Sequence, residues 1–215
     1  MKFGSIKYAP KVFSHKFFLG LRKFLLLLIF FLSVSNTSMA FNDSLIELTN
    51  PYLKDLKKNT RSDVRYTLYN LEAKVQWTAT YISPYFREVF EQRFFELYPH
   101  GQEGAAGKYL QKLANPNQTE FFIAFYANKK SLKNLEGEDS LWSLRLIIGN
   151  EVIKPLTVEA VELNAFYQKF YPYFSNHFRG YRVVFPFSPA QRPELERELN
   201  ISSVAGKSSL YFQNY

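Results

Sequence analysis

The sequence predicts a mainly β, α+β fold, either an antiparallel β-sandwich or an open sheet with one amphipathic helix packed against it. Apolar and polar residues alternate in several short stretches, as they do in half-buried strands, and the clearest of these is 141–148. Gly149-Asn150 follows directly and is typical of a tight hairpin turn. The strongest helical signal is 85–98, where apolar residues recur every three or four positions.

The first 40 residues are expected to be a signal peptide. A head with six Lys and Arg residues and no acidic residue precedes the apolar run 24–32. Ser38-Met39-Ala40 fits the small-residue rule of signal peptidase, so cleavage is predicted between Ala40 and Phe41. The apolar run is shorter than the roughly 20 residues that span a bilayer. We therefore expect export to the bacterial periplasm or beyond, with membrane contact only through an uncleaved signal segment.

Composition excludes several classes of function for the exported part. The chain carries a net charge of +8, but residues 41–215 hold only +2 of it, too little to neutralise the phosphates of a nucleic acid. The chain has three histidines and no cysteine, which argues against a tetrahedral zinc site and excludes disulfides and a lipid-bearing cysteine. We expect no metal and no cofactor.

The first elements are predicted in and after a polar N-terminal segment, 41–63. Pro51–Lys58 is expected to be a short, loosely attached helix. Period-two alternation then predicts one long strand over 64–82, bent or bulged near Asn70.

The amphipathic helix has a recognisable beginning. Ser83 can cap free amide groups, and Pro84 suits the first helical position, so the helix is expected to run to Tyr98. The next strand, 120–127, is apolar on both faces and is therefore predicted to be central or covered by the helix.

The second half of the β-rich globular domain, 64–187, is predicted from the hairpin onward. Its return strand is expected over 152–161, with Pro155 at an edge or bulge. A short helix broken at Pro172 and a strand over 179–187 follow. Residues 188–215 are expected to be a C-terminal extension, which holds a helix at 193–199 and a last edge strand at 208–215.

An aromatic group between these last elements is the most suggestive candidate site. Seven residues form the tentative ligand or partner surface: Phe166, Tyr167, Phe170, Tyr171, Tyr173, Phe174 and His177. They could line a groove for an apolar ligand such as a lipid, or a protein-binding patch. The alternative is that the rings form the lid of the core.

No catalytic residue is assigned. His177 could act as a base for a serine, but no Gly-x-Ser-x-Gly motif places such a serine. The acidic run 136–139 lacks the ligand spacing of a calcium loop and is expected to be a solvated loop.

Several core and turn motifs together resemble a group of exported bacterial proteins. They are Ala79-Thr80-Tyr81 to Phe86-Arg87, Trp142-Ser-Leu144-Arg-Leu146 with Gly149 and Pro155, Tyr171-Pro172, and Tyr181-Arg-Val183-Val-Phe185-Pro186. Members of that group are single β-sandwich-like domains, often lipoproteins, without an assigned activity. The resemblance implies a similar fold over 65–187 and brings no catalytic residue. This chain departs from the lipoproteins because it has no anchoring cysteine.

Three functions remain open from the sequence. The first is a non-enzymatic module of the cell envelope that binds another protein, by analogy with other exported sandwich domains. The second is a carrier or sensor of an apolar ligand, suggested by the aromatic group. The third is a hydrolase that uses His177 with an unrecognised serine or acid.

Overall fold

The computed structural model describes residues 50–66, 73–99, 107, 109–110, 115–204 and 206–213. The predicted signal peptide and the bend expected near Asn70 lie outside these residues. All helices and strands with described bounds belong to one unit of the chain, 51–215.

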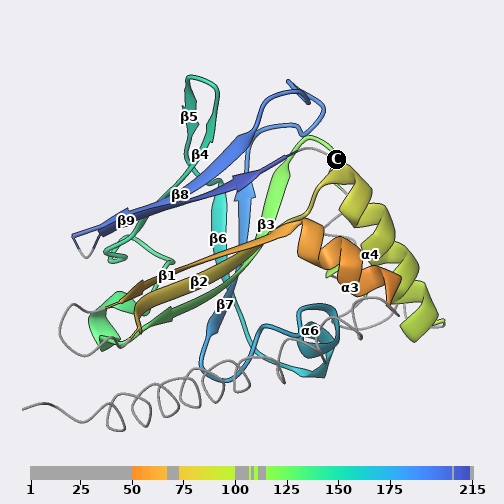
Figure 1. Cartoon of the computed structure of the whole chain (residues 1–215), viewed down its shortest axis with the longest axis horizontal. Coiled ribbons are helices and arrows are strands. Elements are labelled where there is room, and N and C mark those ends of the chain that lie inside the picture. Colours follow the sequence, from red (N-terminus) through yellow and green to blue (C-terminus); the bar gives the residue numbers. More distant parts are fainter. Residues whose placement is uncertain are drawn as a thin grey trace, which may run out of the picture. The chain divides into compact units, whose positions relative to one another are not determined.

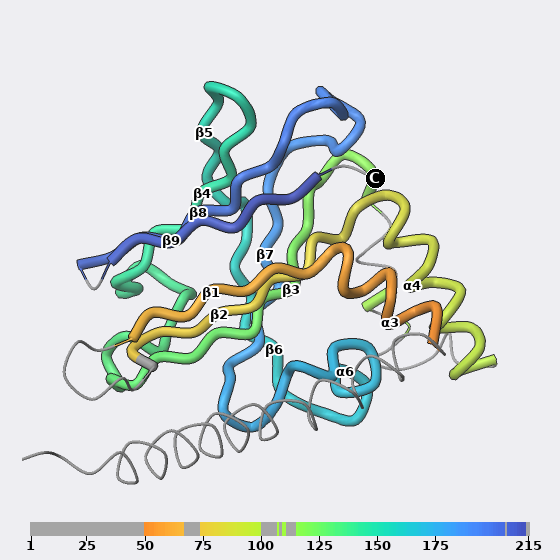
Figure 2. Tube along the Cα trace, in the orientation of Figure 1, coloured from red at the N-terminus to blue at the C-terminus, as the bar shows by residue number. Residues whose placement is uncertain are grey.

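Two antiparallel sheets form the framework, which confirms the predicted mainly β fold (Figures 1 and 2). The five-stranded sheet has the order β1 (Thr60–Tyr66), β2 (Ala73–Tyr81), β3 (Thr119–Ala127), β7 (Arg179–Phe185) and β6 (Thr157–Val161). The four-stranded sheet has the order β5 (Glu151–Ile153), β4 (Ser143–Ile148), β8 (Arg197–Ser203) and β9 (Gly206–Phe212). A 3-10 turn, η1 (Lys130–Leu132), lies between β3 and β4.

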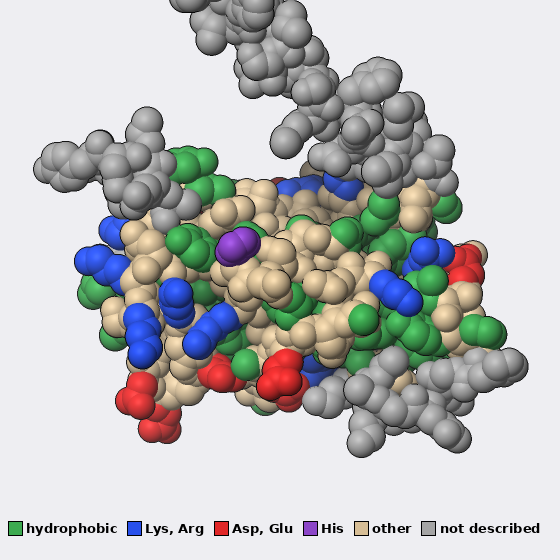
Figure 3. Space-filling view, turned by 90° about the horizontal axis from the view of Figure 1, so that it is seen from below, with side chains coloured by type: hydrophobic (Ala, Val, Ile, Leu, Met, Phe, Trp, Pro, Cys, Tyr) green, Lys and Arg blue, Asp and Glu red, His purple; other side chains and the backbone are tan. Residues whose placement is uncertain are grey.

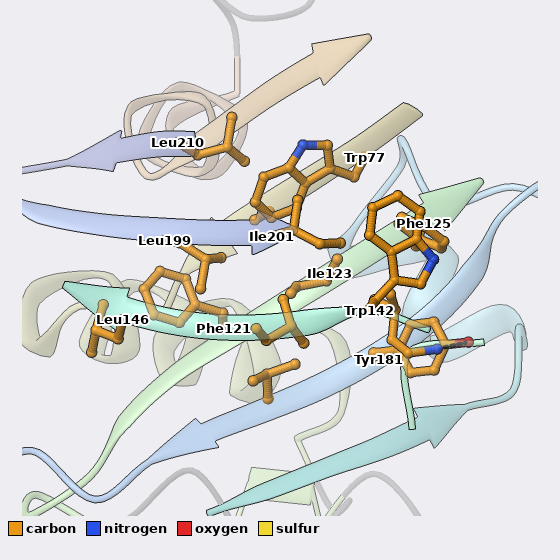
Figure 4. Packing of buried hydrophobic residues seen from close by; sticks show 14 of the residues in the cluster. Trp77, Phe121, Ile123, Phe125, Trp142, Leu146, Tyr181, Leu199, Ile201 and Leu210 are labelled. Carbon is orange, nitrogen blue, oxygen red and sulfur yellow. Dashed lines mark hydrogen bonds between the residues drawn. The ribbon is translucent and has the colours of Figure 1, made fainter. Parts of the chain in front are cut away.

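A core of large side chains fills the space between the two sheets (Figure 4). Every second residue of β2, β3 and β7 enters it from one side, and β4, β8 and β9 supply the other side. Both tryptophans lie in this core and keep their indole donors satisfied. Nε1 of Trp77 donates to Ser208 Oγ at 2.9 Å, and Nε1 of Trp142 donates to the Leu132 carbonyl at 2.8 Å.

Three helices cover the opposite face of the five-stranded sheet (Figure 1). These are α3 (Pro51–Lys58), α4 (Pro84–Leu97) and α6 (Ala165–Phe170). Their apolar side chains form a second core with Phe122 and Ala124 of β3. The predicted amphipathic helix is α4, and β3 is buried on both faces, as its sequence predicted. None of the described helices has the length and apolar character needed to cross a membrane.

The start of α4 is joined to the end of α3 by a buried hydrogen-bonded chain. Ser83 Oγ accepts from the Phe86 amide at 3.1 Å, which is the predicted cap. The same hydroxyl donates to Asn59 Oδ1 at 2.9 Å, and Asn59 Nδ2 donates to the Asp55 carbonyl at 2.9 Å. The Ser83 hydroxyl therefore connects the start of α4 to the end of α3.

We expect Ser83→Ala to destabilise the fold by about 1–2 kcal/mol, because it removes a helix cap and leaves the buried Asn59 oxygen without its donor. The midpoint of urea unfolding measures this change. Ser143→Ala, at an exposed position of β4, is the control and should shift stability by no more than about 0.5 kcal/mol. Equal losses in the two variants would contradict the role assigned to Ser83.

Two predictions at the start of the domain need correction. The single strand expected over 64–82 is wrong, because β1 and β2 are separate strands that pair antiparallel with Thr60 opposite Thr80. The helix expected at Pro51–Lys58 is confirmed in its bounds, but it is not loosely attached. Tyr52 and Leu56 are buried in the second core, so the segment 41–63 includes part of the domain.

The predicted hairpin is confirmed, but its return strand is not a single strand. Gly149 has a φ of +60°, the positive angle that the turn requires. β5 ends after three residues, and 154–156 carry the chain to the other sheet, where the Leu156 amide donates to the Val184 carbonyl at 2.7 Å. Pro155 has no amide to donate to a ladder, which explains the crossing at this point.

The C-terminal residues are part of the domain and not an extension of it. The helix expected at 193–199 is wrong, because β8 begins at Arg197. β8 pairs with β4, β9 pairs with β8, and together they form half of the four-stranded sheet. Leu199, Ile201 and Leu210 are buried between the sheets, so the domain boundary expected after Phe187 is also wrong.

Candidate functional site

The predicted aromatic surface lies mostly inside the second core. Phe170, Tyr171 and Phe174 are buried in this core, so these three rings are packed against other side chains of the protein. Phe166, Tyr167 and Tyr173 are half-buried, and His177 is exposed.

The buried rings pack in the manner of a lid. Tyr171 stacks on Phe122 of β3, with ring centroids 3.9 Å apart, and Phe170 lies 4.3 Å from the ring of Phe90 in α4. Phe174 packs directly over Gly180, where an added Cβ would lie 2.6 Å from its ring. Core packing therefore accounts for the aromatic cluster that suggested an apolar ligand.

Tyrosine hydroxyls form a buried polar layer within this second core. Tyr52 donates to the Phe170 carbonyl at 2.9 Å, Tyr173 lies 2.6 Å from Thr80 Oγ1, and the hydroxyls of Tyr109 and Tyr171 are 3.1 Å apart. Burial raises the pKa of all four hydroxyls above its ordinary value, because the phenolate loses its hydration there. The layer is neutral at physiological pH.

A buried ion pair joins β3 and β7 beneath the same lid. Arg182 Nε and Nη2 donate to the two carboxylate oxygens of Glu120 at 2.7 and 2.9 Å. Glu159 of β6 lies 3.7 Å from the same guanidinium. Burial raises the pKa of Glu120, and the hydrogen bonds and charge of Arg182 oppose that effect. This bidentate pair links two neighbouring strands. Both carboxylate oxygens of Glu120 are occupied by the guanidinium of Arg182.

The groups available for catalysis are few in the part of the chain that the structure describes. His177 lies in a turn before β7 and is exposed to solvent. Figure 3 shows a histidine on a face of the molecule where apolar side chains are scattered among polar and charged atoms. No cluster of three or more His, Asp or Glu side chains suited to a metal occurs among the described residues.

The outer face of the four-stranded sheet presents a site that the sequence did not reveal. Strand register places Val152, Ile147, Glu198 and Tyr211 directly opposite one another, one from each strand, as a row across that face. We call these four residues the outer row. Val152 is 56% exposed and Tyr211 is 50% exposed, so the outer row has a large exposed apolar side chain at each end.

A hollow of about 300 Å³ opens beside the outer row. Its floor and walls are formed by six residues: Ile147, Gly149, Leu195, Glu196, Glu198 and Tyr211. Glu198 is held in place, because Ser209 Oγ donates to its carboxylate at 2.6 Å and Asn200 Nδ2 donates to that hydroxyl at 2.8 Å. We call this hollow the outer groove.

The sequence does not predict the outer groove, because it predicts a helix over 193–199 where Glu198 lies in strand β8. Leu199 and Ile201 alternate with Glu198 and Asn200, which is a period-two signal, but it follows a proline-rich loop and is short. Comparisons with protein-family models, with curated proteins and with solved structures find no match for this chain.

Proposed function

We propose that this chain is an exported, non-enzymatic module of the bacterial cell envelope that binds another protein through the outer face of its four-stranded sheet. One observation carries the proposal: the outer row exposes Val152 and Tyr211 beside a hollow, on a sheet whose other face is fully packed. Exposed apolar patches with a polar rim are typical of protein-binding surfaces, and tyrosine is enriched in them.

The sequence supports the location in this proposal. The basic head, the short apolar run and the small residues before Phe41 together favour export. The near-neutral charge of 41–215 favours a protein partner over a nucleic acid. The resemblance to exported sandwich-like domains agrees with a binding role and remains an analogy.

Site-specific photo-crosslinking in the protein's own host tests the proposal. The full chain is produced with a photoreactive phenylalanine analogue in place of Val152, and in a second strain in place of Tyr211. We expect both to capture the same polypeptide in intact envelopes. The matched control carries the analogue in place of Glu88, an exposed residue of α4 on the other side of the domain.

A charge placed in the outer row provides the second arm of this test. Val152→Asp should leave the thermal midpoint unchanged within about 2 °C, because the side chain is exposed, and should abolish capture at Tyr211. Capture at Glu88 as strong as at Val152, or capture at Tyr211 that survives Val152→Asp, would count against binding at this face.

A further inference from the structure

The rim of the outer groove has an excess of negative charge. Glu196 and Glu198 line the groove, and Glu194 is exposed next to them in the chain. The nearby cation Arg192 lies 3.3 Å from Glu151, so those two charges offset each other. The carboxylate of Glu196 makes no ion pair with any residue that the structure describes.

Arg197 follows Glu196 but does not neutralise the groove. Its side chain is fully buried on the inner face of the sheet, where the guanidinium donates to the carbonyls of Leu195 and Pro189 and lies over the ring of Tyr81. Arg145 stands on the outer face one row away, opposite Asn200, on the side of the outer row that is distant from Gly149 and Glu196. The negative charge is therefore local to the groove.

The walls of the groove suit a long side chain with a cationic end. Leu195 packs over the turn, with its Cδ1 3.4 Å from the position that a Cβ on Gly149 would occupy, and Ile147 continues this apolar floor. The half-exposed ring of Tyr211 forms a wall next to the carboxylate of Glu198. The bond from Ser209 Oγ orients that carboxylate before any ligand arrives, which reduces the entropy lost on binding.

We infer that the outer groove binds an arginine side chain of the partner protein; this inference rests on the proposed function. The aliphatic stem of the arginine lies on Leu195 and Ile147, and its guanidinium stacks on Tyr211 and donates to the carboxylates of Glu196 and Glu198. A planar guanidinium can make the stack and the paired hydrogen bonds together, whereas the compact ammonium of lysine cannot.

A peptide titration followed by NMR tests the inference directly. The isotope-labelled protein, as its host produces it, is titrated with a blocked Gly-Leu-Arg-Leu-Gly peptide and with versions that carry lysine or citrulline in place of arginine. Citrulline keeps the shape of arginine and removes its charge. We expect shifts confined to Ile147, Leu195 and Tyr211, at least about fivefold tighter binding of the arginine peptide than of the lysine peptide, and none with citrulline.

Groove variants show whether the carboxylates and the ring provide the affinity. Glu198→Gln and Glu196→Gln together should weaken the arginine peptide by about tenfold, and Tyr211→Leu should remove its advantage over the lysine peptide. The matched control Glu88→Gln removes an exposed acid of α4 and should leave the affinity unchanged. Equal binding of the citrulline peptide, or an affinity that the double Gln variant retains, would overturn the inference.

The two proposals fail in distinguishable ways. If Val152 captures a partner in the envelope and the arginine peptide does not bind, the protein-binding role stands and the arginine site is refuted. If the arginine peptide binds in the groove and no partner is captured, the site stands as a guanidinium site and the envelope role is refuted.

Discussion

Raising the pH from about 9 to about 12 is expected to unfold this protein in one cooperative step. Six described tyrosines have a pKa raised by burial: Tyr52, Tyr81, Tyr109, Tyr167, Tyr171 and Tyr173. A group whose pKa is higher in the folded state contributes its full stability below the unfolded pKa, near 10 for tyrosine, and loses it as the pH rises toward the folded value. The effect therefore destabilises the fold only in alkali.

The raised pKa of Tyr81 shows how much stability one buried hydroxyl can remove in alkali. Burial raises the pKa of Tyr81 from 10.0 to about 12, against the opposing charges of Arg197 and Arg87. Each pKa unit corresponds to about 1.4 kcal/mol, so ionisation of this one hydroxyl destabilises the folded state by up to about 2.7 kcal/mol, a loss that is complete only above its folded pKa. The other five pKa values shift in the same direction, so ionisation of each of these hydroxyls adds to the loss of stability in alkali.

Two signals recorded on one sample measure the alkaline transition. Phenolate absorbance reports ionisation, and far-ultraviolet circular dichroism reports the two sheets. We expect the buried hydroxyls to ionise only as the dichroism is lost. Above about pH 10, Tyr81→Phe should make the fall of stability with pH shallower by up to about 1.4 kcal/mol per pH unit, and it should leave the slope at neutral pH unchanged. Ionisation of the whole tyrosine content with the dichroism intact would contradict the buried hydroxyl layer.

Glu120→Ala is expected to lower the free energy of unfolding by about 3–5 kcal/mol. The substitution leaves the guanidinium of Arg182 without its bidentate partner in a site where the arginine side chain is only 9% exposed. Glu159 remains 3.7 Å away, but its own side chain is 43% exposed and its field is screened by water. Urea unfolding at neutral pH measures the loss.

The chain provides a matched control for this prediction. Arg192 and Glu151 form the same kind of ion pair at the surface, where their side chains are 52% and 49% exposed. Glu151→Ala should cost less than about 1 kcal/mol, because water screens the pair. The double variant Glu120→Leu with Arg182→Met should recover most of the stability, since it removes both buried charges. A loss in Glu120→Ala no larger than in Glu151→Ala would contradict the assigned burial of the pair.

The candidate site is assembled by strand pairing and not by residues that are close together in the chain. The aromatic group was visible in the sequence because its residues are close together in the chain, and three of its rings, Phe170, Tyr171 and Phe174, are part of the second core. The outer row combines Val152, Ile147, Glu198 and Tyr211 from four strands, and only the strand register brings them together. Nothing in the local sequence of any one strand identifies such a row.

The sequence by itself determined the elements whose signals are local. Ser83 and Pro84 begin α4, Gly149 forms its turn with positive φ, and the apolar faces of β3 required cover on both sides. These features depend on capping, backbone angles and burial within a few residues, which a short stretch of sequence specifies.

Tertiary structure alone decided which strands are neighbours. Glu120 pairs with Arg182 across 62 positions of the chain, β8 is a strand because it joins β4, and the chain crosses between sheets at Pro155. Each of these features depends on contacts between residues far apart in the chain, where the gain from pairing and burial overrides local propensity. The C-terminal residues thus became half of a sheet, and their outward side chains became the proposed binding face.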